Sequence, residues 1–477
     1  MRIPILAALA AACLCAPASA QLPSQQAVDA ILKPLSSARS PGCAVAARKA
    51  GQKVVDRAFG LADLEHEVPN TPTTVFEAGS ASKQFTAAAI LLLAREGKLA
   101  LTDDIRKYLP EIPDYGARIT IDHLLHHTNG MRDWRFLRAI GGQMIGIHVN
   151  SNSDALDTAS RQRALNHQPG AEYAYTNTGY TLAAVIVERV SGKTLAAYTK
   201  EKIFEPLGMN STQWRDDFRR IVKNRAVAYG RSGDGFKWDM PFENAYGAGG
   251  LLTTTGDLLL WNQALDEGRF GPDFTARLEE QGRLNSGEKI SYARGVFVET
   301  YRGTREVSHG GVTLGYVAYL ARFPEHKVSV AVLCNGPFNP NEIAHKVADQ
   351  LLPSNLPAAQ AAALAEAPST APAGPKPELW RPSASELQQL SGTYESDEAS
   401  ATYVAEVAGG RLVLRLDGHP EQKQILSPTY RDTFVFAGGS MKFQRDSRGS
   451  VSGMTLTANR IRELPFVKLI FNPAPSK

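Results

Sequence analysis

The sequence predicts an α+β protein: an antiparallel sheet flanked by helices, with a helical subdomain, followed by a small all-β barrel or sandwich. Three observations predict this order. Strand patterns occur at both ends of residues 41–352, the stretch between them is mostly helical, and short alternating strands follow near the C-terminus. Strands separated by a block of helices are typical of an α+β fold in which the first and last strands share one sheet.

The first strands form a predicted β-hairpin over residues 41–62, which turns at Gly51. A helix is predicted over residues 76–98, and Gly97 is suited to end it. From about residue 100 to 270 the chain consists mostly of helices separated by polar loops. Strand patterns then return, at residues 296–303, 305–311, 315–324 and 327–336.

The composition changes in the last part of the chain. Residues 353–384 are rich in proline and alanine and have no strand pattern, so we interpret them as a linker. From Glu386 onward the chain shows short alternating strands, including hairpins that turn at Gly-Gly pairs. Residues 385–477 are therefore predicted to form a small β domain, and residues 21–352 form the larger domain before it.

Residues 1–20 have the pattern of a secretory signal peptide. Arg2 gives a positive start, an apolar run follows, and Ala18-Ser19-Ala20 provides a cleavage site. We therefore expect cleavage after Ala20 and a secreted or periplasmic protein. No later segment has the roughly 18 consecutive apolar residues of a membrane-spanning helix, so the mature chain should have no integral membrane segment. The sequence does not indicate an oligomeric state.

The charge and the cysteine content argue against several functional classes. The formal net charge is only +4, without a dense Lys/Arg run, so a nucleic-acid partner is not expected. Cys43 and Cys334 are the only cysteines outside the signal peptide. Two cysteines are too few for a disulfide framework or a cysteine metal cluster. We expect no cofactor.

Ser80 and Lys83 stand at the start of the predicted helix over residues 76–98. Residues three apart lie on one side of a helix, so these two side chains should be neighbours, whereas Ser82 points away. A buried helix start offers a positive field and free N–H groups, where a serine can be a nucleophile and a desolvated lysine can be neutral. The simpler alternative is a capping serine followed by a surface lysine, although a capping box would have Glu or Gln at that position.

Two more groups of residues could line a site. Tyr175 and Asn177 stand in a predicted loop just before an apolar helix, where they could also be part of an ordinary capping turn. His309 and Gly311 are predicted at the end of one strand, opposite the start of another. Small residues there allow close approach of a substrate backbone, but a glycine-rich connection with a surface histidine would look the same.

Three histidines in the predicted helical region could form a different kind of site. His123, His126 and His127 have a spacing that could bind a metal on a helix. We expect packing or hydrogen-bonding roles for them instead, and no metal site. The Gly-x-Ser-x-Gly motif of α/β-hydrolases is absent from the sequence.

Taken together, the motifs Ser80-x-x-Lys83, Tyr175-x-Asn177 and His309-x-Gly311 resemble those of the class C β-lactamase-like serine hydrolases. That family includes penicillin-binding DD-peptidases, D-aminopeptidases and esterases. The stretches LLHHTNGM, FEPLGMNST and GAGGLLTTTGDLLLW are also similar to family sequences, so the resemblance covers most of residues 40–350. The C-terminal β part resembles the lipocalin-like domains that are often appended to such hydrolases.

The resemblance implies a role for each of these residues. Ser80 would attack a carbonyl and become acylated, while Lys83 and Tyr175 would move the proton. Asn177 would orient Lys83 or the substrate amide. The backbone N–H groups of Ser80 and Val312 would form the oxyanion hole. A substrate of this family is a small molecule or a peptide.

The sequence departs from the family pattern at His309. β-Lactamases and DD-peptidases usually have a lysine there, which helps to bind a substrate carboxylate and lowers the pKa of the catalytic tyrosine. A histidine should be mostly neutral at pH 7. We therefore expect an esterase or a D-peptidase. The alternatives are a true β-lactamase or a penicillin-binding DD-carboxypeptidase, and a non-catalytic binder of peptides or cell-wall fragments.

The resemblance also bears on the two cysteines. In the family sheet, the first strand lies antiparallel to the last strand of the hydrolase domain. Cys43 begins the first of these strands and Cys334 ends the last. The two residues could therefore be close enough to form a disulfide.

Overall fold

The computed structural model of the protein describes residues 25–35, 39–144, 146–358, 379–419 and 421–469. The predicted signal peptide lies outside these residues, and so does most of the predicted linker. The domain boundaries proposed from the sequence therefore stay predictions, and the elements on either side of the linker are described below.

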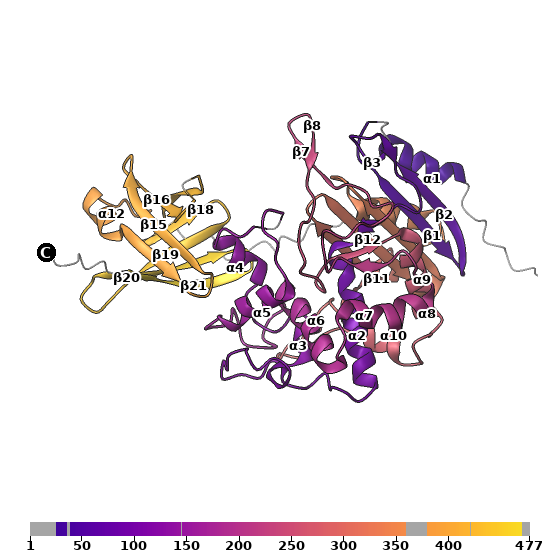
Figure 1. Ribbon diagram of the computed structural model, residues 1–477, viewed down its shortest axis with the longest axis horizontal. Helices are drawn as coiled ribbons and strands as arrows, with labels where there is room; N and C mark the ends of the chain where they lie inside the picture. Colours follow the sequence, from indigo (N-terminus) through magenta and orange to yellow (C-terminus); the bar gives the residue numbers. More distant parts are fainter. Residues whose placement is uncertain (1–24, 36–38, 145, 359–378, 420, 470–477) are drawn as a thin grey trace, which may run out of the picture.

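A six-stranded antiparallel sheet forms the centre of the first part of the chain (Figure 1). Its strand order is β10-β11-β12-β13-β1-β2, so strands from both ends of this part share one sheet, as the sequence predicts. Cys43 is opposite Cys334 in the register of β1 and β13, and the two form a disulfide with a Cα–Cα separation of 4.0 Å. The strands are β1 (Cys43–Lys49), β2 (Gln52–Phe59), β10 (Phe297–Tyr301), β11 (Thr304–Thr313), β12 (Tyr316–Phe323) and β13 (Val328–Cys334).

Helices cover both faces of this sheet, because its central strands are apolar on both sides. Val45 and Val330 belong to the core on one face, and Ala46 and Ala331 belong to the core on the other. Successive residues of a strand point to opposite faces, which explains this alternation. The first face packs against α1 (Gln25–Leu32) and α11 (Pro340–Asp349), and the second against α2 (Lys83–Arg95) and α9 (Thr255–Asp266).

In the middle of the chain helices are the main regular elements, but irregular segments occupy more of it than the sequence predicts. Its long helix α6 (Asn177–Ser191) ends at Gly192, whose φ of +71° is a conformation that glycine adopts without strain. The other helices are α3 (Ile121–Leu125), α4 (Trp134–Ile140), α5 (Asn152–Ser160), α7 (Leu195–Thr199), α8 (Glu205–Leu207) and α10 (Phe274–Leu278).

Shorter elements connect these helices to the sheet. One-turn 3₁₀-helices are η1 (Lys33–Leu35), η2 (Gly79–Ser82), η3 (Ile105–Lys107) and η5 (Pro324–His326), and η4 (Lys200–Phe204) is a π-helix. Two-stranded pairs are β3 (Leu61–Asp63) with β4 (Val68–Pro69), and β7 (Tyr229–Ser232) with β8 (Gly235–Trp238). A three-stranded sheet contains β5 (Phe76–Glu77), β9 (Leu251–Thr253) and β6 (Gln213–Trp214).

The C-terminal part is a closed antiparallel barrel of eight strands (Figure 1). Side chains fill it, as expected for a barrel of this size, and they include Leu412, Leu414 and Leu416 from one face of a strand. The strands are β14 (Gly392–Ser396), β15 (Ala401–Ala408), β16 (Arg411–Leu416), β17 (Lys423–Pro428), β18 (Thr433–Phe436), β19 (Gly439–Arg445), β20 (Val451–Ala458) and β21 (Ile461–Lys468).

One expectation for this part was wrong. The segment that begins at Glu386 is not a strand, because residues Ala384–Leu390 form helix α12. Ser383 and Glu386 make a reciprocal capping box at its start, which satisfies two backbone N–H groups that would otherwise lack partners. The Ser-x-x-Glu spacing that signals such a helix start is present in the sequence.

The barrel packs directly against helix α4 of the first part. Leu137 of α4 is fully buried in the apolar cluster of the barrel, and the Tyr403 hydroxyl donates to the Ile140 carbonyl at 2.9 Å. Arg132 and Glu398 form an ion pair at 3.2 Å in which each side chain is only 2% exposed. These contacts place the turn between β20 and β21 next to the helices of the first part of the chain.

None of the helices in the described part of the chain is both long enough and apolar enough to span a bilayer.

Candidate active site

Ser80 lies on a 3₁₀ turn that precedes helix α2. The predicted helix over residues 76–98 is therefore shorter than expected, because β5 and the turn η2 occupy its start. Gly79 adopts a φ of +50°, and a Cβ there would lie 2.7 Å from the Val312 nitrogen. This tight turn presses Ser80 against strand β11. Ser82 points the other way, and its hydroxyl donates to the Gly79 carbonyl and accepts from the Leu251 N–H.

Lys83 is completely buried beside Ser80. Its Nζ lies 3.1 Å from Ser80 Oγ, 3.1 Å from Asn177 Oδ1 and 2.6 Å from the Ala248 carbonyl oxygen. The last two atoms only accept hydrogen bonds, so they take two N–H groups of the amine. In a neutral amine, the lone pair can then point at the Ser80 hydroxyl.

Electrostatics favours this neutral form of Lys83. Burial lowers the pKa of Lys83 well below its usual value, and the positive charges of Arg135 and Arg460 lower it further. Asp133 acts in the opposite direction. A buried amine without a directly bonded carboxylate loses hydration when charged and regains little of it from its surroundings. The site therefore contains a hydroxyl next to a potential proton acceptor.

Tyr175, in the segment just before helix α6, and Asn177, at the start of α6, both lie next to Lys83. Asn177 is the first residue of α6 instead of a loop residue, because Thr176 caps the helix. Its amide nitrogen donates to Asp133 Oδ2 at 3.1 Å, which leaves the amide oxygen for Lys83. The Tyr175 ring centre lies 4.8 Å from the Lys83 Nζ. Burial raises the pKa of Tyr175 above its usual value, and a hydrogen bond with Ser80 partly opposes this effect.

His309 is buried within β11. The motif lies inside the strand, not at its end, because β11 continues to a two-residue turn after Thr313. Nδ1 of His309 donates to the Gly310 carbonyl at 2.5 Å, and Nε2 lies 3.0 Å from the Tyr292 hydroxyl. Burial, with a smaller contribution from the Lys83 charge, lowers the pKa of His309 to about 3. The imidazole is therefore neutral at pH 7, in line with the expectation from the sequence.

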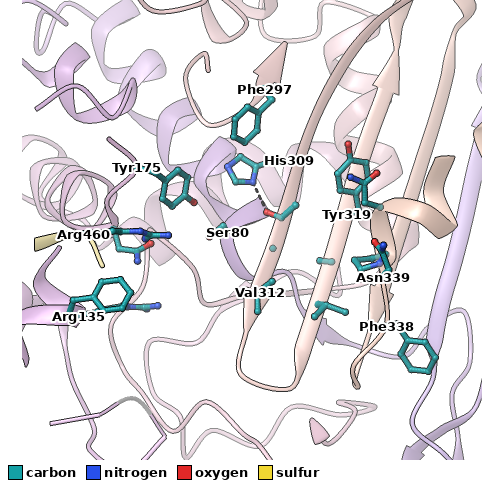
Figure 2. A pocket seen from close by; sticks show the side chains of 18 of the residues that line it. Ser80, Arg135, Tyr175, Phe297, His309, Val312, Tyr319, Phe338, Asn339 and Arg460 are labelled. Carbon is teal, nitrogen blue, oxygen red and sulfur yellow. Dashed lines mark hydrogen bonds between the residues drawn. The ribbon is translucent and has the colours of Figure 1, made fainter. Parts of the chain in front are cut away.

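Strand β11 brings a second backbone N–H group next to the serine. A Cβ on Gly311 would lie 2.0 Å from the Ala78 carbonyl oxygen and 3.0 Å from the Ser80 nitrogen, so glycine is required at this close contact. The next residue, Val312, places its nitrogen beside Gly79. The backbone nitrogens of Ser80 and Val312 therefore lie close to the same tight turn, and Figure 2 shows Val312 and Tyr175 on different sides of Ser80.

The residues considered for a metal site have separate partners. His123 Nδ1 accepts from the Thr120 N–H, and His126 Nε2 donates to the Glu280 carbonyl. His127 Nδ1 accepts from the Thr176 N–H, and its ring lies 4.0 Å from the Tyr175 ring, so it supports the tyrosine. Among the described residues, one group of acids and histidine could hold an ion, and it is on the surface: Asp63, Glu65 and His66.

Comparison with known proteins supports the relationship that the motifs indicate. A family model described as Beta-lactamase matches residues 25–352, which include all three motifs. The chain belongs to the beta-lactamase family. This is a family of β-lactamase-fold serine hydrolases that includes D-aminopeptidases and penicillin-binding proteins.

Two curated relatives illustrate the range of this family. Penicillin-binding protein 4* of Bacillus subtilis is 31% identical over 318 residues, which cover 61% of this chain and 67% of that protein. A D-aminopeptidase of Gluconobacter oxydans is 28% identical over 392 residues, which cover 82% of this chain and 69% of that protein.

Solved structures show the same fold. The octameric penicillin-binding protein homologue from Pyrococcus abyssi has a TM-score of 0.61 at 24% identity and covers 93% of this chain and 99% of its own. D-Amino acid amidase from Ochrobactrum anthropi has a TM-score of 0.60 at 22% identity and covers 68% of this chain and 98% of its own. At these identities the likeness establishes the fold only.

Two residues of the site in this beta-lactamase family member were missed by the sequence reasoning. Asp133 is fully buried; one oxygen caps α4 at Arg135, and the other accepts from the backbone and side-chain amides of Asn177. The only sequence signal for it was an aspartate before a helix. Arg460 comes from the turn between β20 and β21, and it pairs with Asp133 at 3.2 Å. No local pattern marks Arg460.

Ser80, Tyr175, His309 and Arg460 line a cavity of about 790 Å³ (Figure 2). Ser80 lies at its base, strand β11 forms one side with His309 and Val312, and Tyr175 and Arg460 stand on the opposite side. The cavity is large enough for a small molecule or a short peptide segment.

Proposed function

We propose that the protein is a serine hydrolase that forms an acyl-enzyme on Ser80 and acts on esters or on D-amino-acid-containing peptides and amides. The observation that carries this proposal is the contact of Lys83 Nζ with Ser80 Oγ at 3.1 Å, in a fully buried environment that favours the neutral amine. The family relationship supports it, because relatives include a D-aminopeptidase.

In the proposed acylation, Ser80 Oγ forms a bond to the substrate carbonyl carbon as its proton passes to Lys83. The oxyanion accepts hydrogen bonds from the N–H groups of Ser80 and Val312. When the tetrahedral intermediate collapses, the bond to the leaving group breaks, and the leaving atom takes a proton through Tyr175 or Lys83. Water then attacks the acyl-enzyme with the same groups as base, which releases the acid and restores Ser80.

Asn177 and Asp133 act through Lys83 in this proposal. Asn177 is held by two hydrogen bonds to Asp133, so its amide oxygen faces the amine. An acceptor at that position keeps the lysine side chain directed at Ser80. Because the neutral His309 supplies no cation that could bind a substrate carboxylate, β-lactamase or DD-carboxypeptidase activity is the alternative and not the main proposal. The observation that favours this alternative is the Arg460 guanidinium in the same cavity.

The test uses an acylating probe and a substrate panel. A fluorophosphonate should label the wild-type protein at Ser80, located by mass spectrometry of the peptide, and Ser80→Ala should lose both label and activity. A panel of p-nitrophenyl esters, D-alanyl peptides and nitrocefin then separates esterase, peptidase and β-lactamase. A wild-type protein that no acylating probe labels would be a non-catalytic binder of peptides or cell-wall fragments.

Export is a further part of the proposal. The pattern of residues 1–20 supports a cleaved signal peptide and a secreted or periplasmic protein. N-terminal sequencing of the protein recovered from outside the cytoplasm should begin at Gln21. An N-terminus that retains these residues would contradict this part alone.

A further inference from the structure

We propose that Arg460, supplied by the C-terminal barrel, forms an anion subsite in the active-site cavity and selects substrates whose leaving group carries a carboxylate. This inference rests on the proposed acyl-enzyme at Ser80 and specifies its substrate class, which among the peptides is that of the carboxypeptidase alternative. The proposed subsite also makes the barrel part of the active site, because Arg460, which would bind the substrate anion, is not in the hydrolase part of the chain.

The position of Arg460 supports this role. Its guanidinium carbon lies 4.7 Å from the centre of the Tyr175 ring and 5.6 Å from the centre of the Phe136 ring, so two aromatic faces hold it in the cavity. Figure 2 shows it beside Tyr175 on the side of the cavity that faces Ser80. A guanidinium clamped in this way loses little freedom when it binds a ligand.

Arg460 also has free hydrogen-bonding capacity. Within the described residues, its one hydrogen-bond acceptor is Asp133, which takes a single N–H of Nη1 at 3.2 Å. A guanidinium has five N–H donors, so most of them remain for a ligand. The side chain is 39% exposed, although its partner Asp133 is fully buried. A planar carboxylate can accept two parallel N–H groups from such a fork.

The other cation in the cavity wall is less available. Arg135 pairs with the buried carboxylate of Glu243 at 2.9 Å, and its side chain is only 13% exposed. His309, where many family members would have a lysine, is neutral and directed at Tyr292. Arg460 is therefore the group best placed to attract a substrate anion.

The chemistry of the reaction indicates which part of the substrate carries the anion. The leaving atom must receive its proton from the side of Tyr175 and Lys83, because the carbonyl oxygen occupies the opposite side near the Val312 N–H. Arg460 lies over Tyr175, so an anion bound to it belongs to the leaving group. Suitable substrates are peptides whose released amino acid has a free carboxylate, and esters of a carboxylated alcohol or phenol.

Two matched aryl esters test this inference. Both have the same acyl group, and the phenol leaving group carries either a meta carboxylate or a meta carboxamide. We expect the wild-type protein to prefer the carboxylate ester in kcat/KM. Arg460→Ala should reduce this preference by roughly 10- to 100-fold, mainly through KM, because one charged hydrogen-bonding contact is lost. Arg460→Lys should retain part of the preference, and Arg460→Glu should reverse it.

Arg462→Ala is the matched control. Arg462 is on the same hairpin and pairs with Glu172 at 2.9 Å, but it does not line the cavity. Arg462→Ala removes one positive charge, as Arg460→Ala does, and it also removes one contact between the barrel and the rest of the chain. The preference for the carboxylate ester should survive this change. If Arg462→Ala abolishes the preference as Arg460→Ala does, the effect is one of barrel docking, and the subsite is contradicted.

The outcomes separate this inference from the proposed function. Hydrolysis of neither ester, together with no labelling of Ser80, would contradict the hydrolase itself. Hydrolysis of both esters at equal efficiency, unchanged in ratio by Arg460→Ala, would leave the hydrolase in place and overturn the anion subsite.

Discussion

Lys83 is the residue whose environment departs most from what its type prefers. A lysine at a helix start opposes the helix dipole, and this one is also fully buried. Both effects disfavour the ammonium form, and the charges of Arg135 and Arg460 add to them. What would be a structural disadvantage is suited to catalysis, because a neutral amine can accept the serine proton.

This environment predicts a pH dependence. The proposed reaction requires neutral Lys83, so kcat/KM should fall as the pH drops through its pKa. Arg460→Ala removes a positive charge that lowers this pKa, so the pKa should rise toward its usual value and the acidic limb should move to higher pH. The measurement is the pH profile of kcat/KM for the neutral carboxamide ester.

Arg462→Ala serves as the control for that profile, because its guanidinium is outside the cavity. It should leave the acidic limb in place. A limb that moves to lower pH in Arg460→Ala would show that Lys83 is not the group that titrates.

His309→Lys offers a second prediction at this scale. A lysine there would place a cation near Lys83 and Tyr175 and lower the pKa of both. The acidic limb should move to lower pH, and the preference for the carboxylate leaving group should rise. In the double variant with Arg460→Ala, His309→Lys should restore part of the preference for the carboxylate ester that Arg460→Ala removes. If neither the profile nor the preference moves, the neutral histidine is not what distinguishes this site.

At the scale of elements, the site depends on how closely β11 approaches the Ser80 turn. Gly311→Ala would force a Cβ to within 2.0 Å of the Ala78 carbonyl oxygen, so the strand or the turn must shift. The two N–H groups of the proposed oxyanion hole would then no longer converge on one oxygen. We expect kcat to fall by about 10²- to 10³-fold, the loss typical of one missing oxyanion donor, while fluorophosphonate labelling slows in parallel.

Gly310→Ala is the matched control for this prediction. A Cβ at Gly310 would first meet the Tyr319 ring at 3.6 Å, an ordinary contact. Its loss of activity should be much smaller than that of Gly311→Ala. Equal losses in the two variants would mean that the motif acts through strand flexibility and not through this contact.

Elements with strong local patterns were predictable from the sequence. Ser80 and Lys83 are three residues apart, so helical spacing alone places them together. The two barrel hairpins that turn at Gly-Gly pairs were predicted from the alternation of apolar and polar residues in their strands. The start of α2 was misplaced because the constraint that produces the 3₁₀ turn is the close contact with β11. Strand β11 is far away in the sequence, so no local sequence pattern indicates this contact.

At the scale of the whole molecule, contacts between residues far apart in the sequence are even harder to predict. Arg460 enters the site from a polar turn of the barrel, and Asp133, its partner, is more than three hundred residues earlier in the chain. An arginine in a turn looks like any solvated residue until the docking of the barrel is known. The barrel itself was predictable, but its participation in the active site depends on tertiary contacts such as Arg132 with Glu398.

Docking of the barrel should depend on that buried ion pair. Glu398→Ala leaves the Arg132 guanidinium buried without its carboxylate, which should destabilise the protein by about 3–5 kcal/mol. Asp397→Ala removes the adjacent acid, whose pair with Arg163 is exposed on both sides, and should cost less than about 1 kcal/mol. The measurement is the midpoint of urea unfolding, followed by tryptophan fluorescence.

Activity provides an independent readout of the same pair of variants. If the barrel places Arg460 in the cavity, Glu398→Ala should also lose preference for the carboxylate ester, because the β20–β21 turn is no longer held against α4. Asp397→Ala should keep the preference. A Glu398→Ala protein with a lowered unfolding midpoint but full preference would show that Arg460 stays in place without this ion pair, held by Asp133 and the Tyr175 ring alone.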